Sequence, residues 1–538
     1  MTDLYPWNRD YPFPAELTGS STRTGMGLAG WRTERLSNPG DVFIDIYRLL
    51  DRLVDSGNLE LRGRRGTGKT MYFLKGQHQM GEDYIRGRSS DRISAYVDLK
   101  AIHNYQETPS LVLRAENVFR EIIRTVISGG QWEGARRYCV QDYIESQGIA
   151  RRWIANRAVA DLLEFLSSEA TEEIISQEDV EQICLVEHQL IHKKTSPPSV
   201  AALETSQALI NGLREIDREH FIDFHLEVYQ KLIRILNTLK IESLVIFVDE
   251  FSSPTVFQGF QAPLLDRLLR ICDGERVSIK VAAVPGTTIV YDNPSNEGSL
   301  KQNILKVFDF EDQALKNSQV IQTGNFEVFL RNLTNAELFY RIYLDVNNAE
   351  QGFTNFISDT FEKPSDFYEF LKAGEGLPRQ MLEVFFESNN IRKSMNPKGK
   401  LTGLHIQLAS RQSLQITYRS QILGDKKCAA ILTRIYQANS RVIKIERIPE
   451  FVDAVARLAH WGFIHACPIA ATIEPGISAY PLEYFITSYR TEVSNQFSHT
   501  KSKEQIKLDN LTNIEKDQLE QLYPKARPVL LADLSEVV

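Results

Sequence analysis

The stretch from Leu59 to Met80 places the tightest constraint on how this chain of 538 residues can fold. An apolar run typical of a β-strand ends at the segment GRRGTGKT, residues 63–70, and a helical apolar pattern follows through Met71 and Phe73. The segment matches the phosphate-binding loop G-x-x-x-x-G-K-[ST] in its strand, loop and helix context. With Gly at about 7% of residues, a chance match in such a chain has odds of roughly one in a hundred. The stretch therefore predicts a nucleotide-binding loop rather than an ordinary glycine-rich turn.

The loop residues have distinct physical roles in binding phosphate. Glycines let the backbone curl so that consecutive N–H groups point at phosphate oxygens, where a Cβ would obstruct the approach. The dipole of the following helix adds positive charge, the Lys69 ammonium is suited to the β- and γ-phosphates, and the Thr70 hydroxyl is suited to Mg²⁺. The expected binding residues are Gly63, Arg64, Arg65, Gly66, Thr67, Gly68, Lys69, Thr70 and Met71.

A second stretch, SLVIFVDEF at residues 243–251, supplies the acidic half of such a site. Five apolar residues in a row predict a strand buried on both faces, as in a parallel sheet, and the strand ends in Asp249 and Glu250. A carboxylate at that end lies beside the phosphate loop, so Asp249 is expected to hold the hydration shell of Mg²⁺. Glu250 is the candidate base that orients and polarises the attacking water.

Length and composition are ordinary for a soluble protein of several domains. The chain carries 62 Lys and Arg against 70 Asp and Glu, a net charge of −8, so contact with DNA would need a local basic patch. Its five cysteines are scattered without C-x-x-C spacing, which favours reduced thiols over zinc or disulfides. No segment approaches the roughly 20 apolar residues of a membrane span, and the N-terminus lacks the pattern of a signal peptide. We expect a cytoplasmic protein without a membrane partner.

Changes in hydrophobic pattern along the chain predict an α/β P-loop core with a parallel sheet, joined to helical segments. Besides the two strands above, residues 92–99 and 277–285 are predicted as strands, and a fifth strand is expected at 307–310 or 320–321. The pattern between the second and third strands is only helical, which predicts a long insertion. The expected segments are an N-terminal arm at 1–37, the core at 38–326 with the insertion at about 101–240, a helical lid at 327–400, a winged-helix-like domain at 401–490 and a polar tail at 491–538.

Two further helices are expected near the site. Residues 42–54 carry a helical apolar stripe with Asp41 placed to cap it, and this helix either covers the base of a nucleotide or is plain core. The segment GLPR, residues 376–379, leads into a helix with Pro in its first turn. Arg379 is thereby placed to reach across a cleft to the phosphates.

The winged-helix-like domain is predicted from helices followed by a strand, a turn at 474–476 and a second strand near 484–487. Its expected recognition helix presents Glu450, Asp453 and Arg457, with no Lys or Arg in the first turn. That is a poor surface for DNA phosphates, so docking of a protein is at least as good an interpretation as readout of bases.

A cluster of basic and aromatic residues in the insertion has two interpretations. It either contacts phosphate or a partner, or it is a solvated helix face, as runs of charge more often are. Its members are Arg136, Arg137, Tyr138, Arg151, Arg152 and Trp153.

With GRRGTGKT, VIFVDE and GLPR in this order, the chain resembles AAA+ ATPases of the ORC/Cdc6-like group, which includes bacterial members from anti-phage defence loci. The resemblance covers roughly residues 38–490. It implies that the ligands are ATP and Mg²⁺ and that Arg379 senses the γ-phosphate. It also implies that Lys69, Glu250 and Arg379 are the catalytic residues, and that Thr70 and Asp249 serve Mg²⁺.

Three features depart from that group's pattern. The strand end VAAVPGTT lacks the usual sensor Asn, which leaves Thr287 or Thr288 as candidates, and the long insertion is not part of a minimal core. No arginine lies between Thr287 and Phe326, where a finger acting on a neighbouring subunit is expected, so Arg267 and Arg270 are the available substitutes. A finger is typically worth about 10³ to 10⁵ in rate, and without one hydrolysis is slow or waits for a partner.

These features lead to three hypotheses about function. The first is an ATP-hydrolysing switch that moves its lid and winged-helix-like domain against the core and so assembles with its own copies or an effector, in phage defence for a bacterial member. The second is a DNA-binding or DNA-loading ATPase of replication or plasmid maintenance, against which the acidic charge argues. The third is a nucleotide-gated scaffold with little turnover, which would not need Glu250 as a base.

Overall fold

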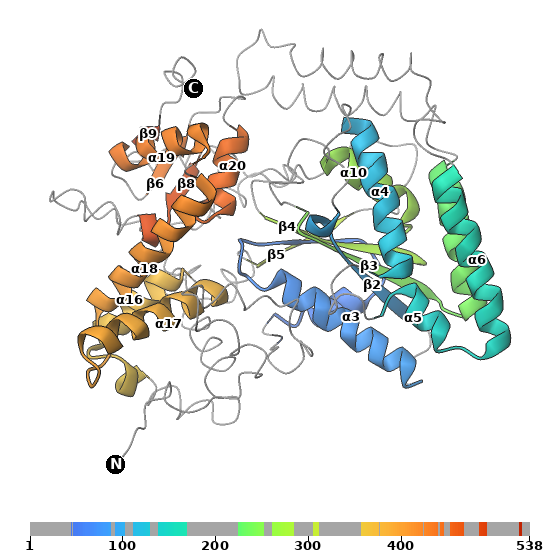
Figure 1. The fold of residues 1–538 in the computed structure, drawn as a ribbon, viewed down its shortest axis with the longest axis horizontal. Coiled ribbons are helices and arrows are strands. Elements are labelled where there is room, and N and C mark those ends of the chain that lie inside the picture. Colours follow the sequence, from blue (N-terminus) through green and yellow to red (C-terminus); the bar gives the residue numbers. More distant parts are fainter. Residues whose placement is uncertain are drawn as a thin grey trace, which may run out of the picture.

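The computed structural model shows an α/β part and a C-terminal part of helices and a small sheet, which lie side by side (Figure 1). Several predictions, among them the arm at 1–37, Asp41, Arg136, Arg137, Thr287, Thr288 and Glu450, lie outside the described residues. The described residues are 45, 47–87, 92–102, 111–129, 138–168, 224–251, 261–284, 305–310, 357–375, 377–422, 424–438, 442–445, 452–466, 484–491 and 527–529.

The α/β part is built on a five-stranded sheet in which every neighbouring pair of strands is parallel. The strand order is β2-β3-β4-β1-β5, so the strand that leads into the phosphate loop lies between β4 and β5. This sheet and its helices confirm the predicted α/β P-loop core. The strands are β1 (Leu59–Arg62), β2 (Arg92–Asp98), β3 (Ser243–Asp249), β4 (Val277–Ala283) and β5 (Lys306–Asp309).

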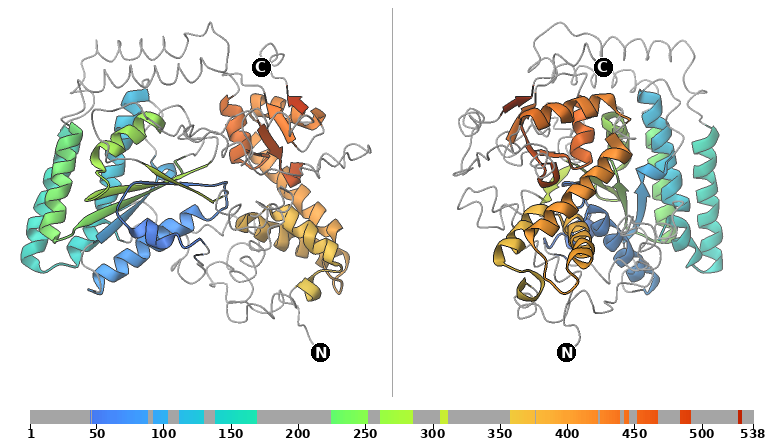
Figure 2. Two further views of the ribbon diagram at one scale, coloured as in Figure 1. Left: turned by 180° about the vertical axis from the view of Figure 1, so that it is seen from behind. Right: turned by 60° about the vertical axis from the view of Figure 1, so that its left-hand side comes forward.

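The fifth strand falls at the first of its two expected places, since β5 overlaps 307–310, whereas 320–321 lies outside the described residues. All seven residues of β3 are buried, which accounts for its unbroken apolar run. The edge of the sheet where the phosphate loop lies faces the C-terminal part, as the view from behind also shows (Figure 2).

Helices cover both faces of the sheet. On one face, α3 (Lys69–Ile85) and α2 (Leu50–Val54) pack in a core with Val245 and Phe247 of β3. The alternate side chains of β3 belong to a second core on the opposite face, as the period of two along a strand requires. That second core is covered by α4 (Leu111–Ser128), α10 (Gln261–Ile271) and the helix at 224–239.

The helix before the loop strand is shorter than the predicted 42–54. The Asp45 carboxylate accepts hydrogen bonds from the backbone amides of Leu49 and Leu50, each at 2.9 Å, and Arg48 has a left-handed φ of 49°. A carboxylate that bonds to nearby amides competes with helix formation, so α2 begins only at Leu50 and the predicted start was wrong.

The described residues between β2 and β3 contain helices and no strand, in agreement with a helical insertion. Besides α4 and 224–239 they include α5 (Val140–Glu145) and α6 (Ile149–Ser168). In the predicted basic and aromatic cluster, Tyr138 is buried and its hydroxyl donates to Glu82. Trp153 of α6 is 65% exposed, so the two aromatic residues of the cluster do not share an exposed surface.

A buried group of charges joins α4, α10 and the helix at 224–239. Glu116 accepts hydrogen bonds from Arg120 Nε at 3.2 Å and from Arg267 Nε at 3.0 Å, and His225 Nε2 lies 3.1 Å from the same carboxylate. Burial alone would raise the pKa of Glu116, but His225, Arg267 and Arg120 hold it at about 2.

Because Arg267 is 1% exposed and paired in this core, the prediction of Arg267 as a substitute finger was wrong. Arg270 is bonded to Asp266, and its role as the substitute finger stays a prediction.

Replacing Arg267 with Ala is expected to lower the free energy of unfolding by about 3–5 kcal/mol, because removing one partner of a buried ion pair leaves the other charge undercompensated. Urea unfolding followed by circular dichroism measures the change. The exposed Arg152→Ala on α6 is the control, with an expected change within about 0.5 kcal/mol. A loss below about 1 kcal/mol for Arg267→Ala would show that the buried cluster contributes little to stability.

The C-terminal part has a helical core followed by a small mixed sheet. α16 (Pro364–Gly374), α17 (Pro378–Met395) and α18 (Gly403–Thr417) pack against one another. The sheet has the order β7-β8-β6-β9, antiparallel except for the parallel pair of β6 and β9. The remaining elements are η5 (Tyr418–Ile422), α19 (Lys426–Ala438), β6 (Val442–Ile445), α20 (Val452–His460), β7 (Ile464–Ala466), β8 (Tyr484–Thr487) and β9 (Arg527–Val529).

Two strands of this sheet were not predicted. β6 was missed, and β9 lies within 491–538, so the prediction of that whole segment as a tail was wrong at 527–529. The assignment of residues 401–490 to a winged-helix-like domain stays a prediction. No helix in the described ranges is both long and apolar enough to cross a membrane.

Candidate nucleotide-binding site

The segment between β1 and α3 turns through the left-handed region of backbone conformation at two glycines. Gly66 has a φ of 92° and Gly68 a φ of 97°, which other residues adopt only with strain. At Gly63 the requirement is space, because a Cβ there would come within 2.8 Å of Thr67 Oγ1. The Thr67 hydroxyl donates to the Arg64 carbonyl at 2.9 Å and closes the turn. The loop therefore has the sharp curvature that phosphate binding requires.

The positive groups of the loop meet where α3 begins. Lys69 Nζ donates to the carbonyls of Gly63 at 2.5 Å and Arg64 at 3.0 Å, which holds the ammonium across the loop. Thr70 and Met71 follow in the first turn of α3. The amides and the dipole of a helix N-terminus favour an anion, here beside the ammonium.

Asp249, at the end of β3, is the buried acid of the site, with 3% of its surface exposed. Its Oδ1 accepts from the Glu250 amide at 2.7 Å, and its Oδ2 accepts from the Tyr96 hydroxyl at 2.9 Å. Its side chain also forms a hydrogen bond with Thr70. Burial first, and then the nearby Glu250, raise the pKa of Asp249, so this carboxyl lies where an added cation would be favourable.

The donor atoms at this point fit Mg²⁺. The Thr70 hydroxyl and the Asp249 carboxylate are hydrogen-bonded to each other at the loop. Both offer oxygen atoms, the kind of ligand that Mg²⁺ prefers. The described residues contain no group of three or more His, Cys, Asp and Glu side chains that would form a protein-only metal site. Mg²⁺ usually takes one or two protein oxygens together with phosphates and water, which agrees with this arrangement.

Glu250 follows in a strained backbone conformation, with a φ of 57°. Its Oε1 lies 2.7 Å from Lys100 Nζ. Burial would raise the pKa of Glu250, but Lys100 and, more weakly, Arg65 lower it to about 2. The side chain is therefore a carboxylate at neutral pH, the form that a water-activating base requires.

Three residues of the site escaped the sequence analysis, namely Tyr96, Asp98 and Lys100 around the end of β2. The register of β2 and β3 places Asp98 directly beside Asp249. Burial, followed by the charge of Asp249, raises the pKa of Asp98 to about 8. The available signal was an Asp at the end of a predicted parallel strand, the same signal that identified Asp249.

The N-terminus of α17 lies against the phosphate loop. A Cβ added at Gly66 would come within 3.2 Å of Arg379 Cβ, so Arg379 adjoins the loop as predicted by the GLPR segment. Arg64 Nη2 donates to the Glu375 carbonyl at 2.7 Å, just before α17. The loop and the proposed lid are thus in direct contact, while the phosphate-sensing role of Arg379 stays a prediction.

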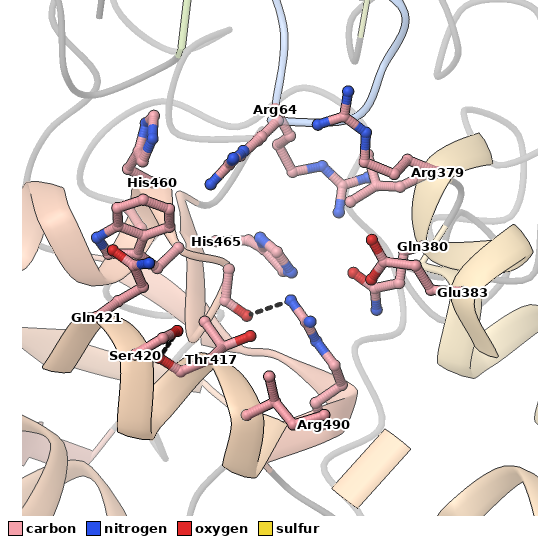
Figure 3. A pocket seen from close by; sticks show the side chains of 16 residues that line it. Arg64, Arg379, Gln380, Glu383, Thr417, Ser420, Gln421, His460, His465 and Arg490 are labelled. Atoms are coloured by element: carbon pink, nitrogen blue, oxygen red, sulfur yellow. Dashed lines mark hydrogen bonds between the residues drawn. The ribbon is translucent and has the colours of Figure 1, made fainter. Parts of the chain in front are cut away.

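A pocket of about 230 Å³ lies between the phosphate loop and three segments of the C-terminal part, namely α17, the junction of α18 with η5, and the turn between α20 and β7 (Figure 3). Arg64 and Arg379 lie at one side of it and Arg490 at the other, with His465 between them and His460 at the edge. Four Arg and two His side chains line the pocket, against one acidic side chain, that of Glu383. Its charge therefore suits an anionic ligand.

Glu375, at the end of α16, joins this helix to the C-terminal sheet. Its Oε2 lies 2.6 Å from His465 Nε2 of β7 and accepts from Gln380 Nε2 at 3.2 Å. Its Oε1 accepts from the backbone amide of Tyr489, which follows β8. Burial would raise the pKa of Glu375, yet His465, the Tyr489 amide and Arg64 lower it to about 2. Glu375 thus connects the end of α16 to the phosphate loop through its carbonyl and to the C-terminal sheet through its carboxylate.

Glu375→Gln is expected to destabilise the protein by about 3 kcal/mol at pH 7, and the difference should narrow as the pH falls. The pKa of Glu375 is about 2 in the folded chain against 4.5 for an unperturbed Glu. Its stabilising effect is therefore fully present above about pH 4.5 and is lost as the pH falls toward 2. Thermal unfolding between pH 7 and 3.5 tests this, with Glu383→Gln, the acidic residue that lines the pocket, as the control. A difference that does not change with pH would contradict an ionised Glu375.

Comparisons with known proteins give no family for this chain. No family model matches it, and no curated protein matches it. Among solved structures, the ORC2 protein of Aeropyrum pernix in ADPNP–ADP complexes is similar at 14% identity over 84% of this chain and 90% of that chain, with a TM-score of 0.27. Drosophila ORC bound to DNA is similar at 12% identity over 83% of each chain, with a TM-score of 0.27. At these TM-scores the likeness carries no argument, and the site rests on the residues described above.

Proposed function

We propose that this chain is an ATP-binding and ATP-hydrolysing switch of the AAA+ type, whose nucleotide state controls its assembly with its own copies or with an effector. The observation that carries the proposal is the meeting of Thr70, buried Asp249 and ionised Glu250 at the N-terminus of α3. A binding loop alone would not need a carboxylate base at this place. Bacterial anti-phage defence is the proposed setting, and that part rests on the resemblance of the sequence motifs.

Each residue has a task in the proposed reaction. Lys69 and the loop amides hold the β- and γ-phosphates, and Thr70 and Asp249 hold Mg²⁺. Mg²⁺, when bound, neutralises the charge that develops on the phosphate oxygens. Glu250 orients the attacking water and accepts its proton, while Lys100 keeps that carboxylate ionised until it does so.

The switch is proposed to run through the contacts of the loop with the lid. Arg379 adjoins Gly66, and Arg64 bonds to the Glu375 carbonyl, so a change in the loop reaches the segment that ends α16 and begins α17. Glu375 in turn bonds to His465 and Tyr489 of the C-terminal part. A nucleotide-dependent shift of the loop would therefore move the proposed lid and winged-helix-like domain together.

Release of phosphate from ATP by the purified chain, with and without double-stranded DNA, tests the proposal. Turnover indifferent to DNA, with a larger assembly in ATP than in ADP by light scattering, is the expected result. Strong stimulation by DNA, together with DNA affinity that falls steeply with salt, would favour a DNA-loading ATPase instead. ATP binding without turnover, even at high protein concentration, would favour a nucleotide-gated scaffold.

A further inference from the structure

The C-terminal part reaches the phosphate loop at the turn between α20 and β7. The guanidinium of Arg65 in the loop lies over the ring of Trp461, 4.7 Å from its centroid. Gly462 follows with a φ of 73°, and its carbonyl accepts from Arg490 Nη2 at 3.3 Å. The turn is therefore held by the loop on one side and by Arg490 on the other.

His460, the last residue of α20, is buried at this contact with 2% of its surface exposed. Its ring packs edge-on against Trp461, with centroids 4.8 Å apart. Neither Nδ1 nor Nε2 of His460 has a hydrogen-bond partner among the residues that the structure describes. A buried polar group without a partner costs free energy, so this side chain has an unmet capacity for hydrogen bonding.

The charges that act on His460 belong to the nucleotide-binding site, since they are Arg65, Glu250, Lys100 and Lys69. Burial first, and then Arg65, lower the pKa of His460 to about 3, so its imidazole is neutral at pH 7. A neutral imidazole offers one N–H donor and one acceptor nitrogen. In the proposed reaction Lys69 would hold the terminal phosphates of ATP and Glu250 the attacking water, and both of these residues act electrostatically on this ring.

We propose that His460 is a nucleotide contact supplied by the C-terminal part, and that its N–H group donates to the terminal phosphate of ATP beside Lys69. This rests on the proposed function, because it presupposes ATP at the loop. The phosphate satisfies the donor that the described residues leave unpaired, so binding of ATP strengthens the docking of α20 on the loop. ADP lacks this phosphate and leaves the docking to Arg65 and Trp461.

Calorimetric titration of the full chain with a non-hydrolysable ATP analogue and with ADP tests the contact. His460→Ala is expected to weaken binding of the analogue about tenfold, the loss of one hydrogen bond to a charged group, and to change ADP affinity less than about threefold. His460→Gln and His460→Asn place an amide N–H near the position of Nε2 and Nδ1, respectively. Recovery of the analogue affinity in one of them identifies the donor nitrogen. His405→Ala removes another buried histidine, bonded to Thr402 and outside the pocket, and should leave both affinities unchanged.

The proposal is overturned if His460→Ala binds the analogue as tightly as wild type, or if ADP affinity falls by the same factor. In either case the ring has a packing role, which a lower unfolding temperature would register. If His460→Ala does not fold, His460→Gln and His460→Asn test the proposed hydrogen bond instead. An equal loss of analogue affinity in both variants overturns it. Failure of the proposed function has a different signature, because wild type would then bind neither nucleotide.

Discussion

Replacing Glu250 with Gln is expected to lower the rate of ATP hydrolysis by about 10²- to 10⁴-fold and to leave ATP binding close to wild type. Gln keeps the size and one oxygen of the side chain, but it cannot accept a proton from water. The wild-type carboxylate is ionised, since Lys100 and Arg65 lower its pKa to about 2 despite burial. Steady-state phosphate release, with ATP affinity measured by titration, separates the loss of chemistry from a loss of binding.

The control for this substitution is Glu242→Gln, an exposed residue directly before β3, at the opposite end of the strand from Glu250. Its turnover should equal that of wild type. Unchanged turnover in Glu250→Gln would contradict the assignment of the base. Loss of ATP binding together with turnover would instead make Glu250 part of the binding site, with its ion pair to Lys100 shaping the pocket.

Lys69→Ala is expected to weaken ATP binding by about 100-fold or more, and with it turnover at ordinary ATP concentrations. Each hydrogen bond to a charged group is worth about 1.5–3 kcal/mol, and an ammonium that spans two phosphates forms at least two of them. Fluorescence or calorimetric titration with ATP measures the loss. The unfolding temperature should change little, because the wild-type ammonium bonds to the carbonyls of Gly63 and Arg64 within its own loop.

Lys75→Ala is the matched control, since Lys75 is a half-buried lysine on the same helix, α3, about 1.7 turns beyond Lys69. It should bind ATP as wild type does. If Lys69→Ala and Lys75→Ala bind ATP equally well, the loop does not hold the phosphates as proposed. The two lysine variants together therefore test the loop itself rather than the general charge of the helix.

The parts of the site that could be predicted are those in which sequence neighbours stay neighbours in space. Gly66 and Gly68 are followed directly by Lys69 in one turn, and the geometry of that turn requires glycine. Asp249 and Glu250 end a strand whose unbroken apolar run reflects burial on both faces. Backbone geometry explains the glycines and burial explains the apolar run, so each local pattern could be interpreted without knowledge of distant contacts.

The parts that could not be predicted depend on pairing between distant segments. Asp98 is brought beside Asp249 by the register of β2 and β3, which no local pattern determines. Arg267 has the pattern of an exposed helical arginine, and only the packing of α10 against α4 shows that it is paired with Glu116. β9 is three residues long and follows a polar segment, so its pairing with β6 leaves no periodic signal. His460 lies on the apolar helix α20, where a core histidine is the ordinary interpretation.

The position of β1 within the sheet has a consequence for how the chain is made. β1 is synthesised well before both of its neighbours, β4 and β5, with Leu59–Arg62 paired to Lys280–Ala283 and Lys306–Asp309. At roughly 5–20 residues per second, the intervening residues, roughly 250 of them, take on the order of 10 to 50 seconds to synthesise. Until β4 has been made, β1 and the phosphate loop that follows it have no partner strand in their sheet. The site that unites this loop with Asp249 can therefore form only after β3 and β4 have been synthesised.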